Sequence, residues 1–283
     1  IALQITKELG GLPLALDQAG AYIEETRCSL ADYLQLYRTQ RAALLKARGG
    51  LVPDHPEPVA TTWSLSFALV QERSIAAADL LRVCAFLHPD AIPEEIITEG
   101  ATALGPGLQA VTQSPLALNQ AIGVLLSYSL LKRQPEKHLL SMHRLVQAVL
   151  KDGMDVPTSH GWAERVVQAV NDALPSDVEY RAYARYERCL PHAQECAKLI
   201  EQEHLTSFAA RRLLYLTGNY LKDHARYAEA ESFYQHSLRI REQALGPDHP
   251  FTRTVMRNYA NLLRKMRRKS EATQLEARFP SSS

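Results

Sequence analysis

The side chains most able to act as nucleophiles or soft metal ligands are four cysteines, and their spacing argues against both roles. The sequence contains Cys28, Cys84, Cys189 and Cys196, and no two of them make the Cys-x-x-Cys spacing of a zinc site or a redox pair. Each cysteine lies in an apolar helical context. We therefore predict four buried thiols in a protein of the reducing cytosol.

The remaining reactive residue types do not form a catalytic pattern either. No Ser-His-Asp or Cys-His pairing stands out in the 283 residues. Phosphoryl transfer would need a Gly-x-x-x-x-Gly-Lys-Ser/Thr loop and an apolar strand that ends in paired acids, and this sequence has neither. We predict that the chain by itself is not an enzyme and holds no catalytic residues and no metal.

Composition limits the classes of partner. The hydrophobic fraction of 46% and the length suffice for about two folded domains. The 32 basic and 31 acidic residues leave a net charge of +1, so no global field attracts nucleic acid or an anionic membrane. No apolar run is long enough to span a bilayer. We expect a cytoplasmic protein without membrane contact, and we expect the natural protein to continue upstream of Ile1.

Residues 1–58 are predicted to form a helical domain followed by a linker. Apolar residues recur at helical spacing from Ile1, and this pattern ends at Gly10-Gly11. Pro13 then begins a second helix. Ser29 and Asp32 make a capping-box pair at the start of a third helix. Three prolines between residues 51 and 60 exclude a regular helix there, which predicts the linker.

Residues 59–155 are predicted to form a winged-helix-like domain. Helical patterns cover about 62–71, 75–87 and 116–127, and Pro93 opens another helix. Two short β-like runs, 129–133 and 138–142, flank a four-residue turn and predict one hairpin. Helices followed by one hairpin in this order are typical of a winged helix.

Residues 156–283 are predicted to form a helical repeat array. Superposing positions 42 residues apart pairs Leu214 with Met256 and Phe233 with Leu275. Small residues recur at positions 218, 230, 260 and 272. Two closely crossed helices need small residues at their contact. The fold class is therefore predicted as mainly α, with a helical domain, a winged helix with one β-hairpin, and an α-solenoid.

Two short motifs carry a resemblance to a known family. The string from Gly11 to Leu16, Gly-Leu-Pro-Leu-Ala-Leu, resembles the Gly-x-Pro element of the NB-ARC group of STAND signalling ATPases. Met142-His143-Arg144 resembles the Met-His-Asp motif of the same family at the end of the wing. The resemblance implies that the chain is the C-terminal part of such a protein and packs on its nucleotide-binding domain.

The resemblance also implies roles for two residues. His143 is expected to reach the β-phosphate of ADP, and Pro13 is expected to touch the adenine, with ADP or ATP bound only in the longer protein. Arg144 departs from the family, where an Asp is expected to cap the following helix. Arg144 would instead add a cation near the phosphates, so the inactive state is expected to be held differently or less tightly.

The repeats resemble tetratricopeptide repeats of the kinesin-light-chain type. The string from Ile240 to Pro250 between two helices is the most specific match, and the resemblance covers about 205–279 well and 160–204 weakly. The resemblance implies a groove that binds a protein or peptide partner.

Two functions from different classes remain open. The leading one is a regulatory, partner-binding portion of a nucleotide-switched signalling protein that contributes to its ADP-bound inactive state. The alternative is a winged-helix DNA-binding regulator with the repeats as its sensor. We do not expect nucleic acid as a partner, because the segment 116–127 contains no Lys or Arg to face phosphates or base edges.

Overall fold

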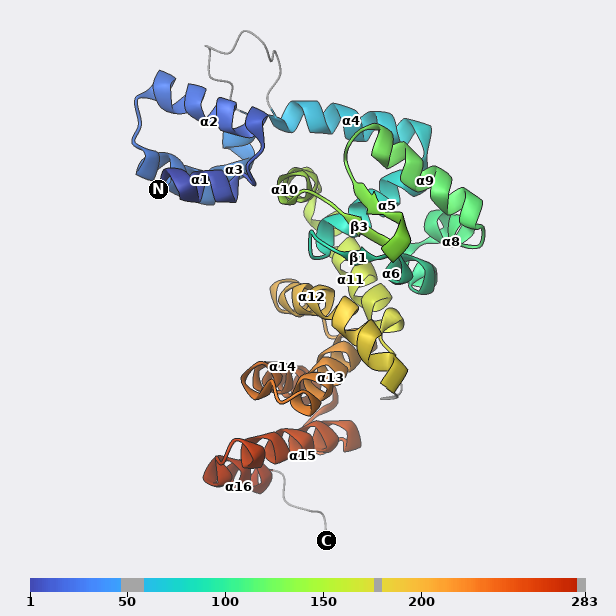
Figure 1. Ribbon diagram of the computed structural model, residues 1–283. Coiled ribbons are helices and arrows are strands. Elements are labelled where there is room, and N and C mark those ends of the chain that lie inside the picture. The colour runs from blue at the N-terminus through green and yellow to red at the C-terminus, as the bar shows by residue number, and fades with distance from the viewer. Residues whose placement is uncertain (47–58, 176–179, 279–283) are drawn as a thin grey trace. The chain divides into compact units, whose positions relative to one another are not determined.

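The computed structural model describes residues 1–46, 59–175 and 180–278, and these residues are mainly helical (Figure 1). This confirms the predicted mainly-α class. The chain divides into two compact units, Ile1–Ala91 with Gly107–Ser159, and Ile92–Pro106 with His160–Ser283. The predicted domain borders after residues 58 and 155 stay predictions, and most of the predicted linker lies outside the described residues.

The helices of the first unit begin and end where local sequence signals favour it. They are α1 (Ala2–Glu8), α2 (Pro13–Thr26), α3 (Leu30–Lys46), α4 (Val59–Arg73), α5 (Ile75–Phe86), α8 (Pro106–Thr112), α9 (Pro115–Ser127) and α10 (Arg144–Asp152). At the start of α3, Asp32 N–H donates to Ser29 Oγ at 3.1 Å and Ser29 N–H donates to Asp32 Oδ2 at 3.2 Å. The predicted capping box is confirmed.

The hairpin is present but shorter than predicted. Strand β2 (Lys132–Gln134), the 3-10 turn η1 (Pro135–Lys137) and β3 (Leu139–Ser141) form it, with Arg133 opposite Leu140. Before β2, Ser129 has a φ of 55°, and Leu130 N–H donates to Leu125 C=O at 3.1 Å. Ser129 N–H also donates to Leu126 C=O at 3.0 Å. The two hydrogen bonds end α9 in a Schellman motif, so the strand cannot begin at Ser129.

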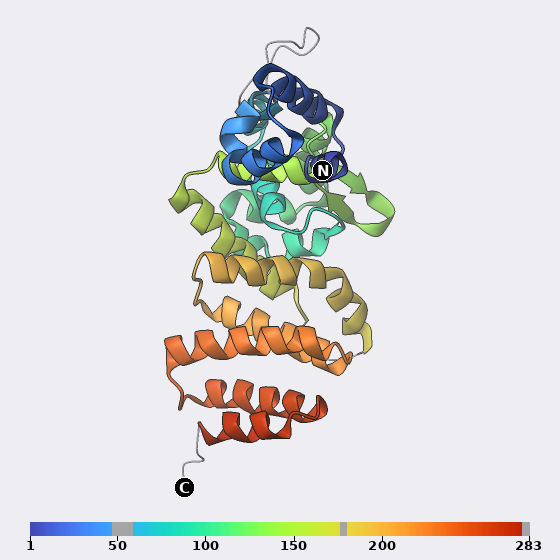
Figure 2. The same cartoon turned by 90° about the vertical axis from the view of Figure 1, so that its left-hand side faces the viewer.

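The second unit holds the remaining elements. They are β1 (Ile92–Pro93), α6 (Glu94–Glu99), α7 (Ala101–Leu104), α11 (Val156–Ala173), which begins at the end of the first unit, α12 (Tyr180–Gln202), α13 (Phe208–Asp223), α14 (Tyr227–Leu245), α15 (Pro250–Lys265) and α16 (Lys269–Ala277). Arg188 on α12 is ion-paired with Glu95 on α6 at 2.8 Å. Figure 2 shows α13 to α16 stacked in successive layers.

The 42-residue period corresponds to two helix pairs, α13 with α14 and α15 with α16. Ala230, Ala260 and Ala272 are fully buried, and a Cβ added to Gly218 would lie 3.4 Å from Phe233 Cβ. A larger side chain at these positions would push the helix axes apart. The prediction that small residues mark the helix crossings is confirmed.

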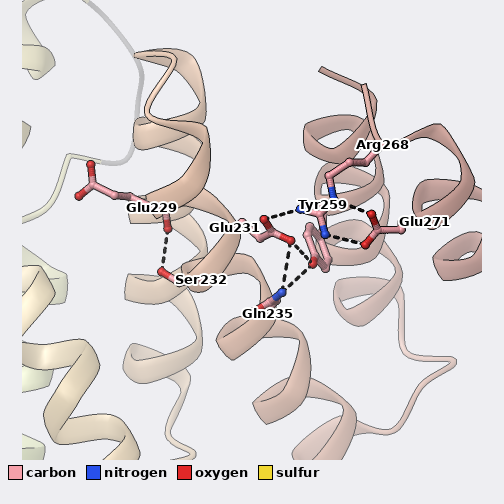
Figure 3. Close-up of polar contacts among 7 residues, drawn as sticks. All are labelled: Glu229, Glu231, Ser232, Gln235, Tyr259, Arg268 and Glu271. Atoms are coloured by element: carbon pink, nitrogen blue, oxygen red, sulfur yellow. Dashed lines mark hydrogen bonds and ion pairs between the residues drawn. The ribbon is translucent and has the colours of Figure 1, made fainter. Parts of the chain in front are cut away.

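A polar network joins the two repeats (Figure 3). Arg268 Nη1 lies 2.7 Å from a Glu231 oxygen, and Arg268 Nη2 lies 2.6 Å from a Glu271 oxygen. Tyr259 O–H donates to Glu231 at 3.0 Å, and Gln235 donates to the Tyr259 oxygen at 2.9 Å. Arg268 thus lies in an ion-pair cluster that ties α14 to the α15–α16 pair.

Candidate functional site at Gly10 and His143

The site begins at the end of α1, where the backbone makes a Schellman motif. Gly10 N–H donates to Lys7 C=O at 3.2 Å, and Gly11 N–H donates to Thr6 C=O at 2.8 Å. Gly10 has a φ of 68°, in the left-handed region that favours glycine. The motif reverses the chain between α1 and α2 and leaves the Gly10 carbonyl available to a partner outside the helix.

His143 supplies that partner from the junction of β3 and α10. Its Nε2 lies 3.1 Å from the Gly10 carbonyl oxygen, and its Nδ1 accepts from Leu145 N–H at 3.2 Å. A ring nitrogen that accepts a hydrogen bond carries no proton, so we assign the neutral ring with its proton on Nε2. His143 therefore caps α10 with one nitrogen and donates to Gly10 with the other.

The contact between Gly10 and His143 leaves no room for a side chain on the glycine. A Cβ added to Gly10 would overlap the imidazole ring at its Cε1 and Nε2 atoms. The same atom added to the neighbouring Gly11 would meet nothing within 4 Å. Glycine is thus required at Gly10 both for its backbone conformation and for its approach to His143.

Helix α10 is held in place by a buried glutamine. Gln147 is buried, and its Nε2 donates to the carbonyl oxygens of Cys84 at 2.8 Å and Leu87 at 2.9 Å. These carbonyls lie at the C-terminal end of α5, where helix carbonyls lack their usual partners one turn on. The Cys84 carbonyl also accepts from Leu87 N–H, at the longer distance of 3.4 Å. Just before α10, Met142 N–H donates to Pro89 C=O at 2.8 Å.

The three N-terminal helices pack on α10 through an apolar cluster. The buried members of this cluster are Ile5, Leu9, Ala15, Ala19, Tyr33, Leu34, Tyr37, Leu145, Ala148 and Val149. At its edge, Arg41 binds Asp152 through two hydrogen bonds of 3.0 and 2.7 Å. Because this ion pair is partly exposed, the apolar contacts carry most of the stabilisation.

An open hollow of about 420 Å³ lies beside the Gly10–His143 contact. Lys7 and Arg144 are exposed and line it, and Asp90 lines it as well. Two cations next to an imidazole N–H suit an anionic group such as a phosphate. The carboxylate of Asp90 opposes such a group and limits the net positive field.

The two residues predicted for nucleotide contact, Pro13 and His143, both belong to the chain's first unit. Pro13 begins α2, three residues after Gly10, but its side chain lies outside the described part. The predicted contacts of Pro13 with adenine and of His143 with phosphate stay predictions. Arg144 occupies the first turn of α10 and does not cap the helix, because His143 is itself the N-cap.

Sequence reasoning missed Gly10 and Gln147 as site residues. Gly10-Gly11 indicated only a helix stop, although two consecutive glycines also permit the close approach that His143 makes. Gln147 was the one polar side chain on the buried face of α10, and a polar residue on such a face needs buried partners. The sequence therefore indicated that Gln147 has buried partners, but it did not indicate that these partners lie on α5.

The cysteines are mostly as predicted. Cys84, Cys189 and Cys196 are buried, whereas Cys28 is only partly buried. Burial raises the pKa of the Cys84 thiol to about 12 and that of Cys189 to about 11, so both stay protonated at neutral pH. Among the described residues, no group of three or more His, Cys, Asp or Glu could hold a metal ion. No helix in the described ranges is long and apolar enough to cross a membrane.

Comparisons with known proteins give two family matches and one relative. A family described as a domain of unknown function (DUF7779) matches residues 68–159, and a tetratricopeptide repeat family matches residues 212–278. The chain is 26% identical over 266 residues to a nucleotide-binding leucine-rich repeat (NLR)-like protein of Hyaloscypha variabilis, covering 89% of this chain and 25% of that protein. The chain thus spans about a quarter of that relative's length. No solved structure matches.

The tetratricopeptide match covers most of α13 and all of α14 to α16, so the predicted repeats are confirmed as an α-solenoid. The DUF7779 match covers α5, the hairpin and α10, and it names no function. Taken together, the repeats and the NLR-like relative favour a regulatory, protein-interaction role for the chain.

Proposed function

We propose that this chain is the regulatory and partner-binding portion of a STAND-type signalling protein that responds to its bound nucleotide. The observation that carries the proposal is the hydrogen bond between His143 and Gly10, which joins the helix-start motif to the end of the wing. The similarity to an NLR-like protein and the tetratricopeptide match support it. In this proposal the unit that contains β2, β3 and α10 serves as a winged helix.

The residues beside His143 fit a phosphate group. Lys7 and Arg144 would supply positive charge, and the Nε2–H of His143 would donate a hydrogen bond. That single N–H already donates to the Gly10 carbonyl oxygen. It can donate fully to a phosphate oxygen only after the hydrogen bond to Gly10 has broken. Nucleotide contact and the Gly10 contact are therefore alternatives, which would couple the nucleotide to the packing of α1 on α10.

One histidine cannot hold ADP by itself. A charge-assisted hydrogen bond contributes about 1.5–3 kcal/mol, whereas micromolar affinity requires about 8 kcal/mol. Most of the affinity must come from a nucleotide-binding domain outside this chain. The chain's own task is then to sense the nucleotide, and the repeats bind a protein or peptide partner.

The DNA-binding alternative has weaker support. Helix α9 carries no Lys or Arg, and one of its two polar candidates, Asn119, accepts a hydrogen bond from Arg133 at 2.7 Å. A recognition helix needs such side chains directed at bases or phosphates.

The test is an ADP titration by calorimetry with this chain and with a longer protein that includes the upstream sequence. We expect no micromolar binding by the chain alone and measurable binding by the longer protein. His143→Ala should weaken that binding about tenfold, while the control His249→Ala should leave it unchanged. Equal ADP affinity for the wild-type and His143→Ala proteins would remove the nucleotide role of His143.

A further inference from the structure

A hollow of about 320 Å³ lies between α4, α5 and α10 within the first unit. Its walls are largely apolar, and Leu81, Val146 and Leu150 line it as buried residues. Trp63 and Phe67 line it from α4 and are only partly buried, so their rings have free surface. Pockets that hold small molecules have volumes of about 300–1,000 Å³ and mostly apolar walls. The size and lining of this hollow, which we call the Trp63 pocket, therefore suit a small molecule.

The charged groups that line the Trp63 pocket already have partners. Arg82 Nη1 lies 2.8 Å from Asp79 Oδ1, and Arg82 Nη2 donates to Gln71 at 2.8 Å. Asp155 accepts from the Thr158 N–H at 2.8 Å, at the start of α11. A charged ligand would have to break one of these contacts or leave its own charge without a partner, which is costly. The pocket therefore favours a neutral ligand.

Trp63 supplies the pocket with a hydrogen-bond donor. In the part of the chain that the structure describes, its indole N–H donates to no other group. An indole nitrogen can only donate, so its natural partner on a ligand is an oxygen that accepts. The rings of Trp63 and Phe67 also favour another flat ring beside them, because aromatic pairs attract one another beyond their burial of apolar area. An aromatic ligand with an acceptor oxygen matches both features.

We propose that the Trp63 pocket binds a neutral aromatic molecule that carries a carbonyl oxygen. The ring of this ligand lies against Trp63 and Phe67, and its oxygen accepts from the indole N–H. Binding releases water from the apolar walls, which is favourable. The Trp63 pocket shares no lining residue with the hollow beside His143. Helix α10 lines the pocket and is capped by His143, so a bound ligand would also restrain this helix.

The test uses the 283-residue chain and prodan, a neutral naphthyl ketone whose emission shifts to the blue in apolar surroundings. A matched probe carries a propyl group in place of the propionyl group and so lacks the carbonyl oxygen. The wild type, Met154→Trp, Thr158→Trp, Trp63→Phe and the control Leu116→Trp are each titrated into a fixed amount of either probe. Met154 is partly buried and Thr158 is exposed, and both line the pocket, whereas Leu116 is exposed on α9 and does not line it. Thermal unfolding checks that each variant folds, and the exposed Thr158 keeps the test valid if the Met154 variant does not.

We expect saturable binding of prodan with a dissociation constant on the order of 100 μM. Met154→Trp and Thr158→Trp fill the pocket and should weaken binding about tenfold, whereas Leu116→Trp should leave it unchanged. Trp63→Phe should weaken the binding of prodan about threefold and leave that of the matched probe unchanged. No saturable binding by the wild type, or full binding by the filled and folded variants, would overturn the proposal. Equal weakening of both probes by Trp63→Phe would overturn the assignment of the carbonyl oxygen to the indole N–H.

Discussion

Two histidines cap helices in the same way, and only one of them also makes a long-range contact. His143 caps α10 and His249 caps α15, each through Nδ1, which accepts from the backbone N–H two residues on at 3.2 Å. Their backbone angles nearly coincide, with φ of −63° in both and ψ of 133° and 137°. The Nε2 of His143 bonds to Gly10, 133 residues away, whereas His249 contacts the nearby Phe251 ring, 5.4 Å between centroids.

The difference shows that a histidine before a helix is first of all a cap. The cap is a local property, which explains why it recurs in a repeat that has no resemblance to a nucleotide site. What distinguishes His143 is its second nitrogen, which joins two segments far apart in sequence. Any nucleotide role of His143 must therefore depend on which group its Nε2–H binds. His249, which makes the cap without a long-range contact, serves as the internal control.

The largest expected effect comes from filling the space beside the His143 ring. Gly10→Ala places a methyl group where the imidazole lies and forces a left-handed alanine, so we expect a loss of about 3 kcal/mol in the free energy of unfolding. Gly11→Ala has a similar φ of 70° but open space, and should cost about 1 kcal/mol. Denaturant unfolding of both variants measures the difference, and equal losses would show that the contact with His143 contributes nothing.

The next effect tests the buried hydrogen bonds that hold α10 in place. Gln147→Leu removes the side-chain donor to the carbonyl groups of Cys84 and Leu87, so we expect a loss of about 2 kcal/mol in the free energy of unfolding. Gln120→Leu, an exposed position on α9, is the matched control and should change stability little. A Gln147 variant as stable as its control would mean that the two buried hydrogen bonds do not stabilise the unit.

A smaller effect separates the two capping histidines directly. His143→Ala removes the cap and the Gly10 contact and should cost about 1.5 kcal/mol, whereas His249→Ala removes only a cap and should cost about 0.7 kcal/mol. Asparagine caps helices well, so His249→Asn should recover most of the loss and His143→Asn only part of it. Full recovery by His143→Asn in thermal unfolding would reduce His143 to a local cap.

The smallest effect concerns acid sensitivity in the repeats. The Arg268 guanidinium holds the pKa of Glu271 below its ordinary value of 4.5. A lowered folded-state pKa contributes stability that is present above the ordinary value and is lost as pH falls through the folded-state value. Stability measured between pH 6 and about pH 3 should therefore fall less steeply in Glu271→Gln than in the wild type. Identical slopes would show that this ion pair is stabilised equally in the unfolded chain.

Local features of this protein were predictable from its sequence, and long-range ones were not. The capping box at Ser29 and the 42-residue repeat depend on residues close together or on a period, so they were visible. The hairpin was predicted too long, because the bonds that close α9 at Ser129 compete with strand pairing. The Gly10–His143 contact joins two residues whose types gave no sign that they would meet.

We propose that the Nε2 of His143 couples the packing of α1 on α10 to a bound nucleotide. The most direct test is the release rate of a fluorescent ADP analogue from the longer protein, measured by stopped flow for the wild type, His143→Ala and His249→Ala. We expect His143→Ala to release the analogue about tenfold faster and His249→Ala to match the wild type. Equal rates in all three proteins would contradict it.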